Sequence, residues 1–221
     1  RTLLYTVLAV VFPMILGLAA ALAFNRKFPL RGLARTIFIL PMMATPVAVA
    51  LVWTMTFHPQ LGVLNWLLGQ VGLPPSMWIY SANTVIPTLV MIEVWHWTPL
   101  VMLLILGGLA SLPVDPYEAA KIDGANGWQI FWRIMVPQIW GTIAVVWTTI
   151  TITVLKVFDI VFVMTNGETG TQVLANLMYS WMFKGTPDYG RGSAIAIVIM
   201  LLVTPIMVWN IRNARREMEG H

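Results

Sequence analysis

The sequence contains no cysteine, and this absence excludes disulfide bonds, thiol catalysis and cysteine-ligated metal sites. Charged residues are also scarce, because Asp, Glu, Lys and Arg make up 10% of the 221 residues, whereas soluble domains carry roughly 25%. No Walker motif is present, so the chain has no phosphate-binding loop with which to hydrolyse ATP. Hydrophobic residues make up 58% of the whole sequence, and the mean hydropathy is +0.79. This composition indicates an integral membrane protein.

Long apolar stretches follow one another along the chain. A spanning helix needs about 20 mostly apolar residues, and five stretches qualify, at about 3–24, 36–57, 84–110, 138–164 and 191–211. We therefore expect residues 1–221 to form a single transmembrane domain, an all-α, polytopic bundle of membrane helices. The chain begins with Arg1 rather than Met, so we expect an N-terminal part of the full protein to be missing.

The basic residues predict the orientation in the membrane. With five spans, the loop after the first span, the segment 115–137 and the C-terminal tail lie on one side and hold nine Lys and Arg residues. The other side has Arg1, Lys184 and Arg191, and the loop 59–83 has no charged residue. Because cytoplasmic loops carry an excess of Lys and Arg, the side with nine should be cytoplasmic. The net charge of +4 is scattered through loops and does not indicate nucleic-acid binding.

The segment 115–137 interrupts the apolar sequence with charge and glycine. Asp115 is expected to cap a first short helix, with Glu118 reaching back to complete a capping box. Gly124 suits the left-handed residue that ends such a helix. This half of the segment predicts a charged helix that stops at a glycine joint.

A second short helix should follow, because Asn126 and Gln129 repeat the capping pattern. Its apolar residues fall at helical spacing and would form one stripe: Trp128, Phe131, Trp132 and Met135. Such a pair could be an amphipathic elbow on the membrane surface. A DNA-reading helix pair is a poor fit, because the segment holds more acid than base and lies between two spans. The small alanines and Gly124 favour a third interpretation, a pair of helices that docks closely against a partner.

The stretch "EAAKIDGANGWQIFWRIMVP" resembles the EAA motif of ABC-importer permeases. The matching residues are Glu118, Ala119, Ala120, Asp123, Gly124, Ala125, Phe131 and Pro137. The stretches "ALAFNRKFPLRGLARTIFILPMMATPVAVALVWTMTFHPQLGVLN", "VFDIVFVMTNG" and "YGRGSAIAIVIMLLVTPIMVWNIR" resemble the carbohydrate branch of this family, of the maltose-permease MalF type, with α-glucoside permeases the nearest subfamily.

This resemblance implies a type I importer (MetI-like) transmembrane domain in a bacterial or archaeal cytoplasmic membrane. The chain would be a permease subunit and not an enzyme, moving a sugar such as an α-glucoside by alternating access. The implied partners are a second permease subunit, a dimer of ATP-binding-cassette ATPases that binds ATP and Mg²⁺, and an extracytoplasmic solute-binding protein. No cofactor is implied on this chain, and the EAA residues would couple it to the ATPase.

A few ionisable residues lie within the apolar stretches, where charges are costly and usually face a cavity or a partner. Glu93 and His96 share a face of one expected helix, and Lys156 lies on the next with Asp159 at the edge of its face. Sugars need polar groups for their hydroxyls and an aromatic face for the ring, which Trp95 or Trp97 could supply. By resemblance, these two helices hold the family's solute pocket, and the residues expected to line the pathway are Glu93, His96, Trp97, Leu100, Thr153, Lys156, Val157 and Asp159.

Other interpretations of these residues stay open. Lys156 and Asp159 could neutralise each other as an i,i+3 pair within one helix, and Glu93 could be solvated near the membrane surface. Alternatively, Glu93, Lys156 and Asp159 could form the proton relay of an ion-coupled secondary transporter, which would not need a docking segment. A membrane scaffold that transports nothing is a more distant hypothesis. A metal site is not expected, because Glu93 and His96 lack a third ligand.

Overall fold

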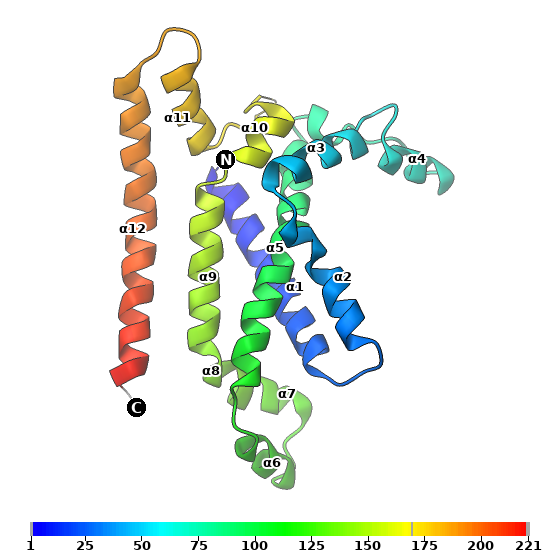
Figure 1. The fold of residues 1–221 in the computed structure, drawn as a ribbon, viewed down its shortest axis with the longest axis vertical. Coiled ribbons are helices and arrows are strands. Elements are labelled where there is room, and N and C mark those ends of the chain that lie inside the picture. The colour runs from blue at the N-terminus through cyan, green and yellow to red at the C-terminus, as the bar shows by residue number, and fades with distance from the viewer. Residues whose placement is uncertain (1, 169, 220–221) are drawn as a thin grey trace.

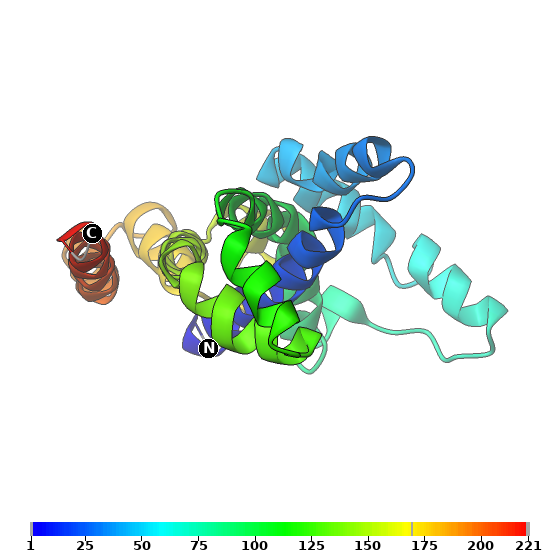
Figure 2. The same ribbon diagram turned by 90° about the horizontal axis from the view of Figure 1, so that it is seen from below.

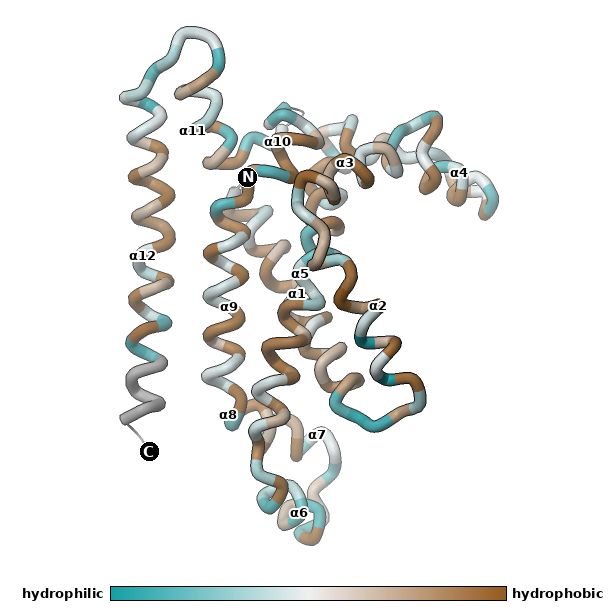
Figure 3. The backbone as a smooth tube through the Cα atoms, in the orientation of Figure 1, coloured by the Kyte–Doolittle hydropathy of each residue, from teal (hydrophilic) through white to brown (hydrophobic). Residues whose placement is uncertain are grey.

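The computed structural model describes residues 2–168 and 170–219, and within them every regular element is helical (Figure 1). The expected all-α class is therefore confirmed. Among the residues described, four stretches are long and apolar enough to cross a membrane: α1 (Thr2–Asn25), α5 (Val85–Ala110), Trp140–Thr165 and Tyr189–Asn213, which belongs to α12 (Tyr189–Glu219). Figure 3 shows hydrophobic residues along these stretches and hydrophilic residues where α1 is linked to α2 (Arg31–Met43).

The expected span 36–57 is not one straight helix. It divides into α2 and α3 (Pro46–Thr56), whose axes differ by 96°. Pro46 accounts for the break, because the residue before a proline is driven out of the helical region. Thr45 accordingly has φ −68° and ψ 144°. Whether the two helices count as one membrane crossing, as the five-span prediction requires, stays a prediction.

The centre of the bundle is formed by α1, α5 and α9 (Trp140–Leu155). Small residues allow the helices to approach closely. A Cβ atom at Gly17 would lie 2.5 Å from Val101 on α5, and one at Gly108 would lie 2.7 Å from Thr142 on α9. Close approach through glycine is the usual packing mode of helices in lipid, where dispersion contacts replace the hydrophobic effect.

Helix α12 stands apart from this centre, as two perpendicular views show (Figures 1 and 2). None of the residues in its apolar window is buried within the chain. The helix packs on α11 (Leu174–Phe183) and on α9, where Asn210 donates hydrogen bonds to the Ala144 carbonyl at 3.2 Å and to Thr148 Oγ1 at 2.9 Å. Most of the α12 surface is therefore free to meet lipid or another subunit.

The two ends of the bundle differ in character. The basic link between α1 and α2, the short helices α6 (Asp115–Ile122) and α7 (Gly127–Ile130), and the end of α12 lie at one end (Figure 1). This clustering agrees with the charge pattern, while the side of the membrane that this end faces stays a prediction. The opposite end carries α4 (Val63–Gln70) and the 3₁₀ turn η1 (Trp78–Tyr80). There Asn65 links the segments by donating to Pro59 O at 2.8 Å and accepting from the Trp78 indole at 2.7 Å.

Candidate functional site

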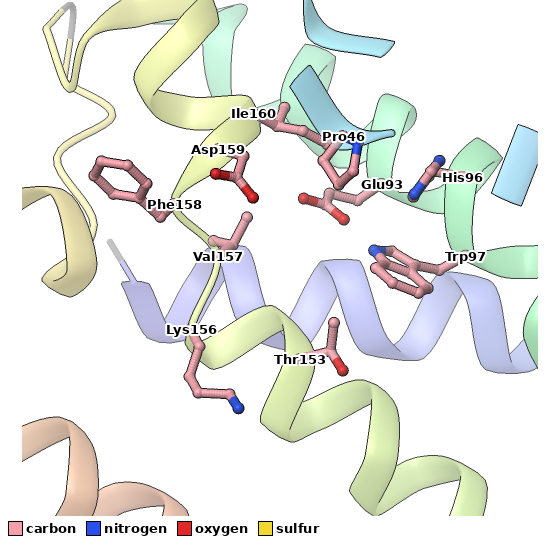
Figure 4. A pocket seen from close by; sticks show the side chains of 10 residues that line it. All are labelled: Pro46, Glu93, His96, Trp97, Thr153, Lys156, Val157, Phe158, Asp159 and Ile160. Atoms are coloured by element: carbon pink, nitrogen blue, oxygen red, sulfur yellow. The ribbon is translucent and has the colours of Figure 1, made fainter. Parts of the chain in front are cut away.

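A cavity of about 100 Å³ lies where α5 faces the junction between α9 and α10 (Asp159–Thr165) (Figure 4). Its lining residues come from α3, α5, α9, α10 and the junction: Pro46, Glu93, His96, Trp97, Thr153, Lys156, Val157, Phe158, Asp159 and Ile160. The cavity thus gathers residues from three parts of the sequence that lie far apart: α3, α5 and the consecutive helices α9 and α10. Seven of the eight residues expected to line a solute pathway are among these ten.

The junction is a break in the helix rather than a continuous turn. Helix α9 ends at Leu155 and α10 begins at Asp159, with Phe158 at φ −134° and ψ −54° between them. The shared helix face expected for Thr153, Lys156 and Asp159 therefore does not exist as one surface. Interrupted membrane helices leave backbone groups unpaired, and such groups are tolerated where they line a cavity.

The charges at this break match the helix ends that carry them. Lys156 occupies the C-terminal cap of α9, and Asp159 lies in the first turn of α10. A cation is stabilised at a helix C-terminus and an anion at an N-terminus, because the peptide dipoles align along the helix axis. Each charge thus has a favourable interaction with its own helix end.

Lys156 and Asp159 do not neutralise each other. Within the described residues no salt bridge joins them, and Figure 4 shows the Lys156 amine pointing away from the Asp159 carboxylate. Both side chains are exposed in the isolated chain. The interpretation as an i,i+3 pair within one helix is therefore wrong for this structure, because the helix that would carry the pair is broken.

Glu93 is the deepest polar residue of the cavity and is only 1% exposed. Its Oε1 accepts a hydrogen bond of 2.9 Å from the hydroxyl of Tyr5, which is itself fully buried on α1. The alternative interpretation of Glu93 as a solvated surface residue is therefore wrong within this chain. Sequence reasoning missed Tyr5, because nothing in the local pattern of α1 indicates a contact 88 positions away.

His96 and Trp97 complete the α5 wall. Their rings meet edge to face with centroids 4.9 Å apart, and the indole nitrogen of Trp97 points toward the Glu93 carboxylate (Figure 4). The Nδ1 atom of His96 is buried and has no hydrogen-bond partner among the described residues. Of the two candidate tryptophans, Trp97 lines the cavity, while Trp95 stacks edge to face on Trp53 at 5.4 Å, outside it.

Leu100 does not line the cavity. It packs against the hydrophobic core one turn further along α5. Three lining residues were absent from the expected set: Pro46, Phe158 and Ile160. Phe158 and Ile160 flank Asp159 and come with the broken helix, whereas Pro46 arrives only through the bend between α2 and α3. Among the described residues no group of three or more His, Asp or Glu side chains could hold a metal ion.

The joint predicted at Gly124 is confirmed. Gly124 has φ +80° and terminates α6, with Asp123 as the capping residue. The amide of Ala125 donates to Ala120 O at 2.9 Å, and the amide of Gly124 donates to Lys121 O at 3.1 Å. This pair of bonds is the Schellman motif, which satisfies carbonyl groups left free at a helix C-terminus.

Of the two expected capping boxes, one forms. Asn126 Oδ1 accepts from the Gln129 amide and Gln129 Oε1 accepts from the Asn126 amide, both at 2.9 Å. The box expected from Asp115 and Glu118 is wrong, because Val114 occupies the capping position and no side chain bonds there. Val114 has helical backbone angles, φ −81° and ψ −31°, which do not suit a capping residue.

The apolar stripe of the second helix is also altered. Helix α7 passes into a π-helical turn, η2 (Phe131–Met135), and then α8 (Val136–Gln138). The rings of Trp128, Phe131 and Trp132 still contact one another, so the wider winding separates only Met135 from the expected stripe. Trp128 and Trp132 remain exposed at 71% and 51%, while Met135 packs against the core.

The EAA residues form a projecting surface at the end of the bundle (Figure 1). The exposed members are Glu118, Ala119, Asp123, Gly124 and Pro137, and the partly exposed members are Ala120, Ala125 and Phe131. Ile122, at the end of α6, is 86% exposed although it is apolar. An exposed surface of small and apolar residues held by two defined caps fits the docking interpretation of this segment.

Comparison with known proteins gives a family and several relatives. Residues 14–217 match the family model described as "Binding-protein-dependent transport system inner membrane component". The alpha-glucoside transport system permease protein AglF of Rhizobium meliloti (strain 1021) is 52% identical over 196 residues, covering 86% of this chain and 58% of AglF. The trehalose/maltose transport system permease protein MalF of Thermococcus litoralis is 32% identical over 214 residues, covering 97% of this chain and 72% of that protein.

A solved structure has the same fold. The crystal structure of a bacterial ABC transporter involved in the import of the acidic polysaccharide alginate includes a chain that matches with a TM-score of 0.87 and 25% identity. The match covers 97% of this chain and 77% of the other. This chain thus spans 58% of AglF and about three quarters of the other two proteins.

Proposed function

This chain belongs to the family of binding-protein-dependent transport system inner membrane components, and from this membership we propose that it is the permease subunit of an ABC importer that moves a sugar into the cell. Its fold is that of an ABC-importer transmembrane domain, and it is a multi-pass membrane protein. Members of this family are transporter components rather than enzymes, and the ATPase is a separate subunit. Transport would proceed by alternating access in a bacterial or archaeal cytoplasmic membrane.

The relatives support a neutral α-linked disaccharide or oligosaccharide as the solute, since alpha-glucoside and trehalose/maltose permeases both match. The chemistry of the cavity fits such a solute. Glu93, Lys156 and Asp159 offer acceptors and a donor for sugar hydroxyls, and the Trp97 indole offers an apolar face. The single observation that carries the proposal is this gathering of polar and aromatic side chains at a helix break, within a chain that matches the family over residues 14–217.

The cavity is too small to hold a disaccharide by itself. It measures about 100 Å³, whereas ligand pockets usually measure about 300–1,000 Å³. Lys156 and Asp159 are exposed on its open side, where lipid would be a costly neighbour for a charge. We therefore propose that a second permease subunit covers this side and that the solute pathway runs between the two subunits.

The segment 115–137 supports coupling to an ATPase. In this proposal the surface of α6 docks on the ATP-binding-cassette subunits, with Glu118, Ala119, Ala120 and Ala125 at the contact and Gly124 as its joint. ATP binding would close the ATPase dimer, and the segment would pass the movement to α5 and α9. An extracytoplasmic binding protein would deliver the solute at the opposite end.

A test uses the complete importer reconstituted in proteoliposomes, with radiolabelled maltose, trehalose and monosaccharides as solutes. We expect uptake of an α-linked disaccharide that requires both ATP and the binding protein. Uptake driven by a proton gradient without ATP would instead support a secondary transporter with the Glu93, Lys156 and Asp159 relay.

Two tryptophans on the same helix give a matched pair of variants. Trp97→Ala removes the aromatic wall of the cavity and should weaken uptake, while Trp95→Ala removes a ring outside it and should have little effect. Equal effects of the two variants would mean that this cavity is not the solute pathway.

A further inference from the structure

We propose that Tyr5 is a positioning residue of the solute site, which holds the Glu93 carboxylate so that its free oxygen can accept a hydrogen bond from a hydroxyl group of a neutral sugar. The inference rests on the proposed function. It adds a residue of α1 to a site whose lining residues all come from later elements.

The contact itself is well defined. The Tyr5 hydroxyl donates to Glu93 Oε1 at 2.9 Å, and the side chains are 0% and 1% exposed. Water therefore does not compete for this bond within the chain. Because both groups are buried, this hydrogen bond fixes the end of the Glu93 side chain.

The bond from Tyr5 to Oε1 of Glu93 leaves the second carboxylate oxygen, Oε2, as the one to consider for solute binding. In Figure 4 the Glu93 carboxylate points into the cavity, toward Asp159 and the indole of Trp97. In the proposed arrangement Tyr5 holds Oε1 and the ligand bonds to Oε2, where a carboxylate accepts a hydrogen bond from a donor such as a sugar hydroxyl.

The position of Tyr5 is set by close packing of α1 against α5. Gly17 brings α1 into contact with Val101, where no larger side chain fits. At the start of α1, Thr2 Oγ1 accepts a hydrogen bond from the Leu174 amide at 3.2 Å, which ties this helix to α11. Because α1 is held at both points, the Tyr5 hydroxyl lies in a fixed position against Glu93.

The test is Tyr5→Phe in the reconstituted importer, because phenylalanine keeps the buried ring and removes only the hydroxyl. We expect KM for the transported disaccharide to rise by up to about tenfold, the upper part of the range expected for one hydrogen bond. The value of kcat should change by less than about twofold, as when binding alone is weakened. Tyr189→Phe, on a tyrosine that is 64% exposed, is the matched control and should leave KM unchanged.

A double-variant cycle with Glu93→Met separates positioning from other roles. Methionine is similar in length to glutamate, and its thioether sulfur is only a weak hydrogen-bond acceptor, so Tyr5→Phe should add little to the rise in KM once Glu93 is replaced. Full additivity of the two changes would overturn the positioning role. A loss of thermal stability in Tyr5→Phe with KM unchanged would also overturn it, because the contact would then be structural alone.

Different results would contradict the positioning role of Tyr5 and the proposed solute pathway. If Glu93→Met weakens uptake and Tyr5→Phe does not, the positioning role is wrong while the solute site stands. If neither variant changes KM, the solute does not use Glu93, and the proposed pathway is wrong as well.

Discussion

Replacing Gly124 with alanine should loosen the coupling between ATP hydrolysis and transport. Gly124 has φ +80°, and a Cβ atom built there would meet nothing within 4 Å. The cost is therefore backbone strain without a steric clash. A residue with a side chain in the left-handed region costs about 1–2 kcal/mol, which corresponds to roughly a fivefold to thirtyfold shift away from the observed joint.

The joint matters because it sets the angle between two short helices. Its two Schellman bonds, from Ala125 to Ala120 and from Gly124 to Lys121, form only when Gly124 is left-handed. If alanine relaxes to a helical conformation, these bonds are lost and α6 reorients on α7. We expect the subunit to assemble normally, while fewer solute molecules are transported per ATP hydrolysed.

Gly127 provides a matched control in the same segment. It opens α7, does not have a positive φ, and a Cβ atom there would also meet nothing within 4 Å. Gly127→Ala should therefore keep the coupling ratio, and Gly124→Asn should lose less than Gly124→Ala because asparagine tolerates the left-handed region. The assay is the ratio of solute uptake to phosphate release in proteoliposomes. Equal ratios for Gly124→Ala and Gly127→Ala would refute the reasoning.

Four further predictions rest on the same structure. Because the chain has no cysteine, Ile122→Cys (86% exposed) should react with an impermeant maleimide only from the cytoplasm, and Leu61→Cys (85% exposed) only from outside; the reverse pattern would contradict the orientation. Ala120→Cys should form a crosslink with a cysteine in the ATPase, which an outward-facing segment could not do. Lys156→Leu and Asp159→Val should each lower uptake without mutual rescue in the double variant, because no salt bridge joins them among the described residues; full uptake by the double variant at equal complex levels would place the pathway elsewhere. Asn210→Leu removes two bonds to α9 and should lower the stability of the purified subunit by about 0.6–2 kcal/mol, whereas Thr204→Val, which loses only a bond within α12, should not.

Features that depend on neighbouring residues could be predicted from the sequence. The membrane class follows from composition, and the glycine joint and the Asn126–Gln129 box follow from backbone and side-chain chemistry within four positions. The ionisable residues of the proposed solute site could be chosen for a similar reason, since an ionisable side chain in an apolar stretch needs a cavity or a partner. The full set of eight also rested on the family resemblance, and seven of the eight lie in one cavity.

The capping pattern also led to one wrong prediction, the capping box at Asp115. The capping pattern is present there, but Val114, whose backbone angles are helical, occupies the capping position instead. A side chain can cap only where the backbone leaves the helical region. The sequence pattern alone does not determine the φ and ψ angles of Val114.

The remaining features are decided by contacts between distant parts of the chain. Lys156, Val157 and Phe158 include neither glycine nor proline, yet the helix breaks there, where α10 packs against α3. The same packing brings Pro46 to the cavity, and across the break Lys156 points away from Asp159 (Figure 4). Tyr5 reaches Glu93 because Gly17 lets α1 approach α5 closely. Sequence spacing determines which face of a helix a residue occupies, whereas only the packed bundle determines what that face meets, because helices in lipid are positioned by close contact with one another.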